Sequence, residues 1–251
     1  SNTAMGHFVL NNATSSNNTG IGMNSLRATT TGGNNVAVGY YALFSNTEGG
    51  QLTAVGHGAL QVNTTGAYNT ALGGTALDAN TTASYNVAIG YGVLTSNTTG
   101  ANNTSVGTNS LLLNTTGEMN VAVGAYALDA NTTGSHNTAS GTYSLTDNTT
   151  GSYNTAFGRA SLTRNTTASN NTAVGYAALD YNTTGAQNVA VGNYALDGNT
   201  TANDCTAIGY SALTAANTGT NNTALGANSL QTNTSGHSNT GLGRYALQAN
   251  T

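Results

Sequence analysis

A pattern of 17 residues repeats along almost the whole chain without a change of phase. The pattern is N-[TV]-A-[VIL]-G-x-x-[AS]-L-x-x-N-T-T-G-x-x, and its full copies begin at Asn18 and run to the copy that begins at Asn222. A slightly shorter copy begins at Asn2, and a partial copy begins at Asn239. One unit of this length is too small to bury its own apolar side chains, so successive units must stack and bury them together. The repeat predicts an all-β parallel solenoid (a β-roll or β-helix) of about fifteen coils that forms a single domain over residues 1–251.

The position of a residue within the unit predicts its local structure, and we number the positions 1 to 17 from the leading Asn. Positions 2 to 4 alternate in size, as in Val36-Ala37-Val38, which predicts a short strand with positions 2 and 4 inward and position 3 outward. Position 8, which is Ala, Ser or Val, is expected to face outward in a second strand that also contains position 9. Helices are excluded because no stretch longer than about eight residues is free of Gly or of an Asn-Thr-Thr cluster.

Gly occupies position 5 and Leu occupies position 9 in every unit. A Gly at the same place in each coil predicts a corner with a positive φ angle or a close backbone approach. A stacked Leu predicts a core column. The corner residues are Gly39, Gly56, Gly73, Gly90, Gly107, Gly124, Gly158, Gly175, Gly192 and Gly209. The core residues are Leu43, Leu60, Leu77, Leu94, Leu111, Leu128, Leu145, Leu162, Leu179, Leu196 and Leu213.

The N-T-T-G segment at positions 12 to 15 has the composition of a turn. Stacked Asn side chains can hydrogen-bond from coil to coil, so position 12 predicts an amide ladder. The alternative is glycosylation, because each Asn-Thr-Thr is also an acceptor sequence. The residues with these two readings are Asn63, Asn80, Asn97, Asn114, Asn131, Asn148, Asn165, Asn182 and Asn199.

The composition argues against several classes of function. Only 5% of the residues are charged and the net charge is −4, so there is no basic stripe for nucleic acid. No apolar run is long enough to insert into a membrane. We expect the chain to have no enzymatic activity, no cofactor and no metal site, and a calcium ion between Asp180 and Asp197 is the alternative. Cys205 stands where the repeat has Asn, and we expect it to be a tolerated substitution. The histidines, expected at the surface, are His7, His57, His136 and His237.

Tyr residues are frequent at positions 6 and 7, directly after the corner Gly. An aromatic ring with a polar tip can contact glycans or other surfaces, and it can equally pack against a neighbouring coil or protomer. The candidate surface contacts are Tyr40, Tyr91, Tyr126, Tyr176, Tyr194 and Tyr210.

The units N-V-A-V-G at 35–39 and N-V-A-I-G at 86–90 resemble the head repeats of trimeric autotransporter adhesins. The phrase N-T-A-V-G-Y-A-A-L at 171–179, followed by N-T-T-G, also resembles repeats of phage and bacterial tail-fibre-like proteins. The resemblance implies a left-handed β-roll, a homotrimer and a place on a bacterial or virion surface. The adhesin unit is about fourteen residues long, so this chain must place three more residues in a turn.

We therefore expect a structural or adhesive extracellular fibre, or a filament subunit, that acts by rigid reach and multivalent weak contacts. Its expected partners are further copies of itself, joined laterally or end to end, and glycans or surfaces. The solenoid is expected to be uncapped at both ends and is compatible with a segment of a longer fibre. The alternative function is ice binding by stacked Thr pairs such as Thr64 and Thr65.

Overall fold

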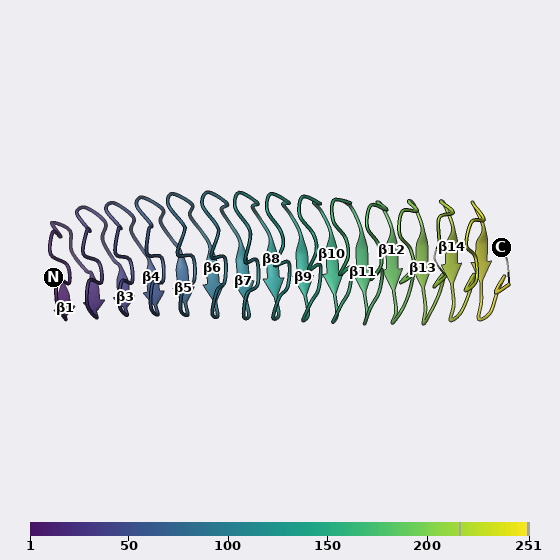
Figure 1. Cartoon of the computed structure of the whole chain (residues 1–251), viewed down its shortest axis with the longest axis horizontal. Coiled ribbons are helices and arrows are strands. Elements are labelled where there is room, and N and C mark those ends of the chain that lie inside the picture. The colour runs from purple at the N-terminus through teal and green to yellow at the C-terminus, as the bar shows by residue number, and fades with distance from the viewer. Residues whose placement is uncertain (216, 250–251) are drawn as a thin grey trace. The chain divides into compact units, whose positions relative to one another are not determined.

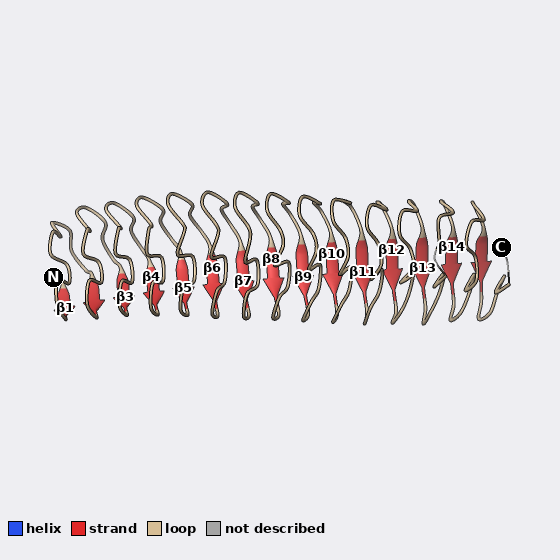
Figure 2. Cartoon of the chain, in the orientation of Figure 1, coloured by secondary structure: helices blue, strands red, loops and turns tan. Residues whose placement is uncertain are grey.

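The computed structural model describes residues 1–215 and 217–249. The chain divides into two compact units, Ser1–Asn120 and Val121–Thr251. Each unit is a parallel β-solenoid in which every coil contributes one strand of three residues (Figures 1 and 2). The described residues contain no helix. The predicted fold class is therefore confirmed: the chain is an all-β solenoid built from repeats of about 17 residues.

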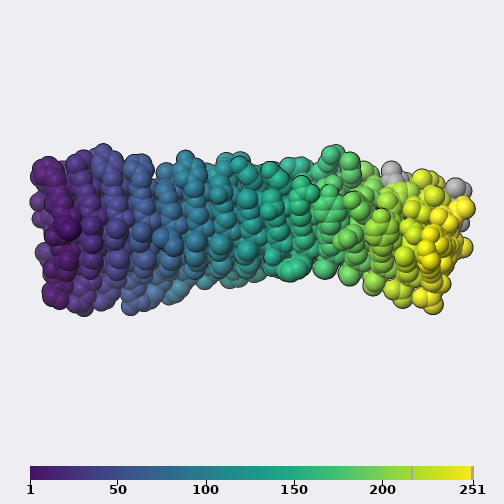
Figure 3. All heavy atoms as spheres, turned by 90° about the horizontal axis from the view of Figure 1, so that it is seen from below, coloured from purple at the N-terminus to yellow at the C-terminus, as the bar shows by residue number. Residues whose placement is uncertain are grey.

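Consecutive strands of each unit pair in parallel, and equivalent positions of successive coils lie side by side. Val36 pairs with Thr53 and Val38 with Val55, for example, and each coil is a narrow band of atoms in the space-filling view (Figure 3). The strands of the first unit are β1 (Thr3–Met5), β2 (Thr19–Ile21), β3 (Val36–Val38), β4 (Thr53–Val55), β5 (Thr70–Leu72), β6 (Val87–Ile89) and β7 (Thr104–Val106). Those of the second unit are β8 (Val121–Val123), β9 (Thr138–Ser140), β10 (Thr155–Phe157), β11 (Thr172–Val174), β12 (Val189–Val191), β13 (Thr206–Ile208), β14 (Thr223–Leu225) and β15 (Thr240–Leu242).

The predicted orientation of the strands is wrong. Position 3 is buried, as at Ala37 and Ala122, whereas positions 2 and 4 point outward. Position 8 was expected to face outward, but Ala42 and Ala127 are also fully buried. The narrow interior already holds the Leu column and two Asn side chains per coil, so small side chains suit positions 3 and 8. These positions are mostly Ala or Ser, and Val93 at position 8 is also fully buried.

The Leu column lies in the core as expected, and every residue of the predicted Leu set is 0% exposed. The predicted second strand around it does not form. Each Leu has a φ angle between 49° and 57°, in the left-handed region, and the segment is a series of turns. This conformation costs roughly 1–2 kcal/mol for an L-residue, and burial of the Leu side chain offsets the cost with about 1.5–3 kcal/mol.

The Gly at position 5 forms the predicted corner. Gly124 has a φ angle of 136°, and the other corner Gly residues of the predicted set have φ angles between 129° and 139°. A Cβ atom on Gly124 would lie 2.6 Å from the carbonyl carbon of Gly141 in the next coil. Both reasons for a Gly at this corner, the positive φ angle and the close approach, therefore apply.

Two Leu residues of the same coil provide a matched test of the core. Leu111 is 0% exposed and Leu113 is 48% exposed. We expect Leu111→Ala to lower the free energy of unfolding by about 2–5 kcal/mol because it leaves a cavity between stacked coils. Leu113→Ala should change it by less than about 0.5 kcal/mol. Denaturation followed by circular dichroism measures both, and equal effects would contradict the assignment of the core.

Candidate functional site

The predicted Asn ladder is present in both units. Asn165 donates a hydrogen bond from Nδ2 to Oδ1 of Asn148 at 2.9 Å, and its own Oδ1 accepts one from Nδ2 of Asn182 at 2.9 Å. In the first unit, Nδ2 of Asn80 donates to Oδ1 of Asn63 at 2.7 Å. The ladder links Asn46, Asn63, Asn80, Asn97 and Asn114 in the first unit, and Asn131, Asn148, Asn165, Asn182 and Asn199 in the second.

A second column of buried Asn, at position 1, was not given a role from the sequence. Nδ2 of Asn171 donates to the carbonyl of Gly185 at 2.9 Å, and its Oδ1 accepts the backbone N–H of Asn188 at 3.0 Å. The carbonyl at position 15 joins the two columns within a coil: the oxygen of Ala168 accepts hydrogen bonds from Asn154 at 2.8 Å and from Asn165 at 2.9 Å. The sequence pattern that could have predicted this arrangement is the recurrence of Asn at positions 1 and 12 together with a small residue at position 15.

These contacts decide between the two readings of the Asn-Thr-Thr triplets. The Asn side chains of the predicted set are 0% exposed, and their Nδ2 atoms donate into the coil. A sugar on Nδ2 would occupy the space of the neighbouring coil. The folded chain therefore uses these Asn residues as a ladder, and glycosylation does not fit their burial.

The ladder of the second unit ends at Asn199. Its Oδ1 is buried without a hydrogen-bond partner, and position 12 of the next coil is Ala216, which lies outside the described residues. The coil that follows the one with Asn199 begins with Cys205. The Sγ atom of Cys205 lies 3.8 Å from Nδ2 of Asn217 and 3.4 Å from the carbonyl oxygen of Gly219. Burial raises the pKa of the Cys205 thiol. The thiol thus fills an Asn site and is shielded from solvent.

In each of the two compact units, the outward side chains of the strands form an exposed face. We call it the strand face and define it as positions 2 and 4 of every 17-residue repeat. Position 2 is Thr or Val throughout, and position 4 is an apolar residue except at Ser140. Val36 is 39% exposed and Phe157 is 58% exposed. The other large apolar residues exposed on this face are Met5, Ile21, Leu72, Val121, Val123, Ile208, Leu225 and Leu242. The sequence prediction missed this face because it assigned these residues to the core.

The Tyr residues predicted as surface contacts mostly pack along the coils. Tyr126 stacks on Tyr143 with ring centroids 5.4 Å apart, and Tyr194 meets Tyr176 and Tyr210 edge to face. Tyr40 stacks on the exposed His57 at 5.5 Å. Tyr91 is the most exposed of the predicted set.

A further aromatic column at position 17 was not predicted. Tyr68 stacks on Tyr85 at 4.8 Å in the first unit, and His136 stacks on Tyr153 at 4.8 Å in the second. Residues at position 17 have φ angles near 60°, which turns the side chain out of the coil. The recurring aromatic residue two places after Gly or Ala at position 15 was the available signal.

Acidic residues at position 10 are half-buried beside the Leu column. The pKa of Asp129 and of Asp197 is raised to about 6, mainly by burial and in smaller part by the neighbouring carboxylates Asp147 and Asp180, respectively. Burial also raises the pKa of Asp78. Within the described part of the chain, no group of three or more His, Cys, Asp or Glu side chains is arranged to hold a metal ion. Among the described residues, Asp180 and Asp197 are therefore not part of a group with a third His, Cys, Asp or Glu side chain.

The four histidines are exposed and lie on separate coils. Within the described ranges, the chain has no helix that is long and apolar enough to cross a bilayer. Comparison with models of known protein families, with curated proteins and with solved structures finds no match to this chain.

The Asn ladder can be tested in one turn of the second unit. Asn165→Ala removes a donor and leaves Oδ1 of Asn148 and Nδ2 of Asn182 without their ladder partners inside the solenoid. We expect the free energy of unfolding to fall by about 2–4 kcal/mol. Thr167→Ala, at an exposed position of the same turn, is the control and should have little effect. Thermal melts that do not distinguish the two variants would rule out a stabilising ladder.

The half-buried carboxyl groups predict that the protein is more stable in mild acid. Because the folded pKa of Asp129 and Asp197 is about 6, above the ordinary 3.8, each group binds its proton more tightly when folded. Their contribution to stability is therefore complete below about pH 4 and is lost as the pH rises through about 6. The double variant Asp129→Asn with Asp197→Asn should raise the free energy of unfolding by about 1 kcal/mol per site at pH 8. This value is smaller than the pKa shift alone would give, because solvent screens the half-exposed carboxylates. At pH 4 the gain should vanish. A gain that is the same at both pH values would refute the burial of these carboxyls.

Proposed function

We propose that the chain is a structural and adhesive fibre subunit that associates laterally with copies of itself through the strand face. One observation carries the proposal: the exposed, uncharged and largely apolar columns at positions 2 and 4. Contiguous exposed apolar surface of this kind marks interaction sites in soluble proteins. The extracellular setting is part of the proposal and is supported by the resemblance of the N-V-A-V-G units to adhesin heads.

The chemistry of the strand face fits another copy of the same face. Positions 2 and 4 carry no charged residue in any unit, and charged residues are depleted at the centre of stable protein interfaces. The side chains stand in parallel columns because the strands are in register from coil to coil. Two such faces can therefore pack along their length, and each added coil enlarges the contact.

The rest of the surface suits weak, repeated contacts rather than catalysis. Its charged residues and histidines are few and scattered, with four Arg, six Asp, two Glu and four His in the whole chain. The same exposed positions recur on every coil, so weak contacts with a regular partner surface add up by multivalency.

Ice binding is a second candidate, and it is favoured by the exposed Thr column at position 14. Thr65, Thr82 and Thr99 of the first unit are exposed in successive coils. The first Thr of each pair is less available, because its hydroxyl donates to the next coil, as Thr64 Oγ1 does to the oxygen of Thr81 at 3.0 Å. Thermal hysteresis and shaping of ice crystals by the purified protein would favour this candidate.

Charged substitutions on the strand face test self-association. We expect the wild-type protein to sediment as a homo-oligomer, and Val123→Lys with Phe157→Lys to dissociate it, because an unpaired charge is costly in an apolar interface. Thr133→Lys with Thr150→Lys, on exposed turns of the same unit, is the control for added charge and should leave the oligomer intact. Circular dichroism verifies that all variants are folded. A folded wild-type protein that stays monomeric at every concentration would overturn the proposal.

A further inference from the structure

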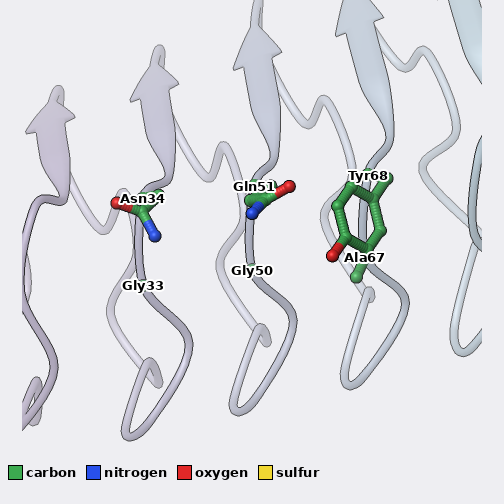
Figure 4. A pocket seen from close by; sticks show the side chains of 6 residues that line it. All are labelled: Gly33, Asn34, Gly50, Gln51, Ala67 and Tyr68. Atoms are coloured by element: carbon green, nitrogen blue, oxygen red, sulfur yellow. The ribbon is translucent and has the colours of Figure 1, made fainter.

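A shallow pocket of about 290 Å³ lies on the first unit, over three consecutive coils. It is formed by positions 16 and 17, and in Figure 4 the side chains of the position 17 residues stand in a row along the coils. The lining residues are Gly33, Asn34, Gly50, Gln51, Ala67 and Tyr68. The pocket uses neither the strand face nor the Tyr residues after the corner Gly.

Two Gly residues open the floor of this pocket. Position 16 is Gly only at Gly33 and Gly50, whereas most other coils have Ala or Ser there, as at Ala67 and Ser84. Neither Gly33 nor Gly50 has a positive φ angle, so the backbone conformation does not require Gly. A Cβ atom on Gly33 would lie 3.2 Å from the carbonyl oxygen of Ser16, and one on Gly50 would lie 3.0 Å from the carbonyl oxygen of Gly33. Both contacts are close, so Gly is the residue that fits these two places with least strain, and it leaves two neighbouring coils without a side chain at position 16 beside Asn34 and Gln51.

One wall of the pocket is an aromatic ring with a free face. Tyr68 stacks on Tyr85 of the next coil with ring centroids 4.8 Å apart and planes 5° apart. The opposite face of the ring has no stacking partner among the described residues, and Figure 4 shows Tyr68 next to Gln51 in the row of position 17 residues. Tyr68 is 48% exposed, so this face is accessible to a ligand.

The pocket also offers uncommitted hydrogen-bonding groups. The side-chain amide of Gln51 and the hydroxyl of Tyr68 have no hydrogen-bond partner among the residues that the structure describes. Asn34 receives a hydrogen bond from Asn17 at Oδ1, at 3.2 Å, and keeps its Nδ2 donors for a ligand. An amide supplies both donors and acceptors, which matches a hydroxyl group that needs one of each.

We propose that this pocket binds a neutral saccharide. An aromatic face suits the C–H face of a sugar ring, and the amides of Asn34 and Gln51 suit its hydroxyl groups. None of the six lining residues is charged, so the pocket has no partner for an acidic sugar. Its volume is at the lower end of the range of small-molecule sites, about 300–1,000 Å³, which indicates one or two sugar units. The inference rests on the proposed adhesive function for its biological role, but the site lies within one chain and does not need self-association.

The experiment measures binding of four neutral disaccharides, cellobiose, maltose, lactose and N,N′-diacetylchitobiose, by saturation-transfer NMR at about 10 mM, where millimolar binders are detected. Sialyllactose is the acidic comparison. The informative variant is Gly33→Ser with Gly50→Ser, because Ser occupies position 16 in other coils and the fold accepts it there. Tyr68→Ala removes the ring, and Tyr153→Ala removes the equivalent ring of the second unit as a control.

We expect at least one neutral disaccharide to bind, with affinity about tenfold weaker in the double Ser variant and in Tyr68→Ala and unchanged in Tyr153→Ala. Three results would overturn the proposal: no binding by the folded wild-type protein, equal binding by the double Ser variant, or binding of sialyllactose alone. Sedimentation of the same samples separates this outcome from a failure of the proposed function, because a monomer that binds sugar supports the site and contradicts self-association.

Discussion

The two columns of buried Asn amides are the constraint on which the rest of the structure depends. An amide inside the solenoid is costly unless its donors and acceptor are all satisfied, and here the partners lie in the next coil or at position 15 of the same coil. Each Asn must therefore lie directly beside the equivalent Asn of its neighbour. The shorter first coil keeps this match, because Oδ1 of Asn2 accepts the backbone N–H of Asn18 at 2.9 Å. The match of the Asn columns is therefore the feature that the repeated pattern preserves from coil to coil.

The core that results is unusually polar and narrow, and the remaining positions adjust to it. Two Asn and one Leu per coil fill most of the interior, so Ala suffices at positions 3 and 8. The chain closes around this small core with tight turns, which place Leu at position 9 and the residue at position 17 in the left-handed region. The larger β-branched and aliphatic residues of the strands are left outside, where they form the strand face. The exposed apolar surface is thus a direct consequence of the polar interior.

The sequence predicted the features that depend on periodicity alone. Constant spacing predicts the solenoid, invariant Gly at position 5 predicts the corner, the stacked Leu predicts a core column, and the stacked Asn predicts an amide ladder in the turn. The prediction that positions 2 and 4 face inward was wrong, and alternation at Val36-Ala37-Val38 could not have decided it because it is the same for either orientation. The usual rule that larger apolar residues face inward fails here because the buried Asn at position 1 occupies the space they would need. The pocket at Gly33 and Gly50 was missed for a related reason: it depends on the small departures of three coils from the shared pattern.

Hydrogen exchange of the Asn side-chain amides, followed by NMR, tests the central constraint most directly. The amide protons of buried residues such as Asn63 and Asn165 take part in the ladder and should exchange as slowly as backbone amides of the strands. Exposed Asn residues such as Asn102 and Asn170 provide the reference in the same spectrum and should exchange rapidly. Slow exchange confined to the buried set is the result that the structure predicts. Equal, rapid exchange of both sets in the folded protein would contradict it.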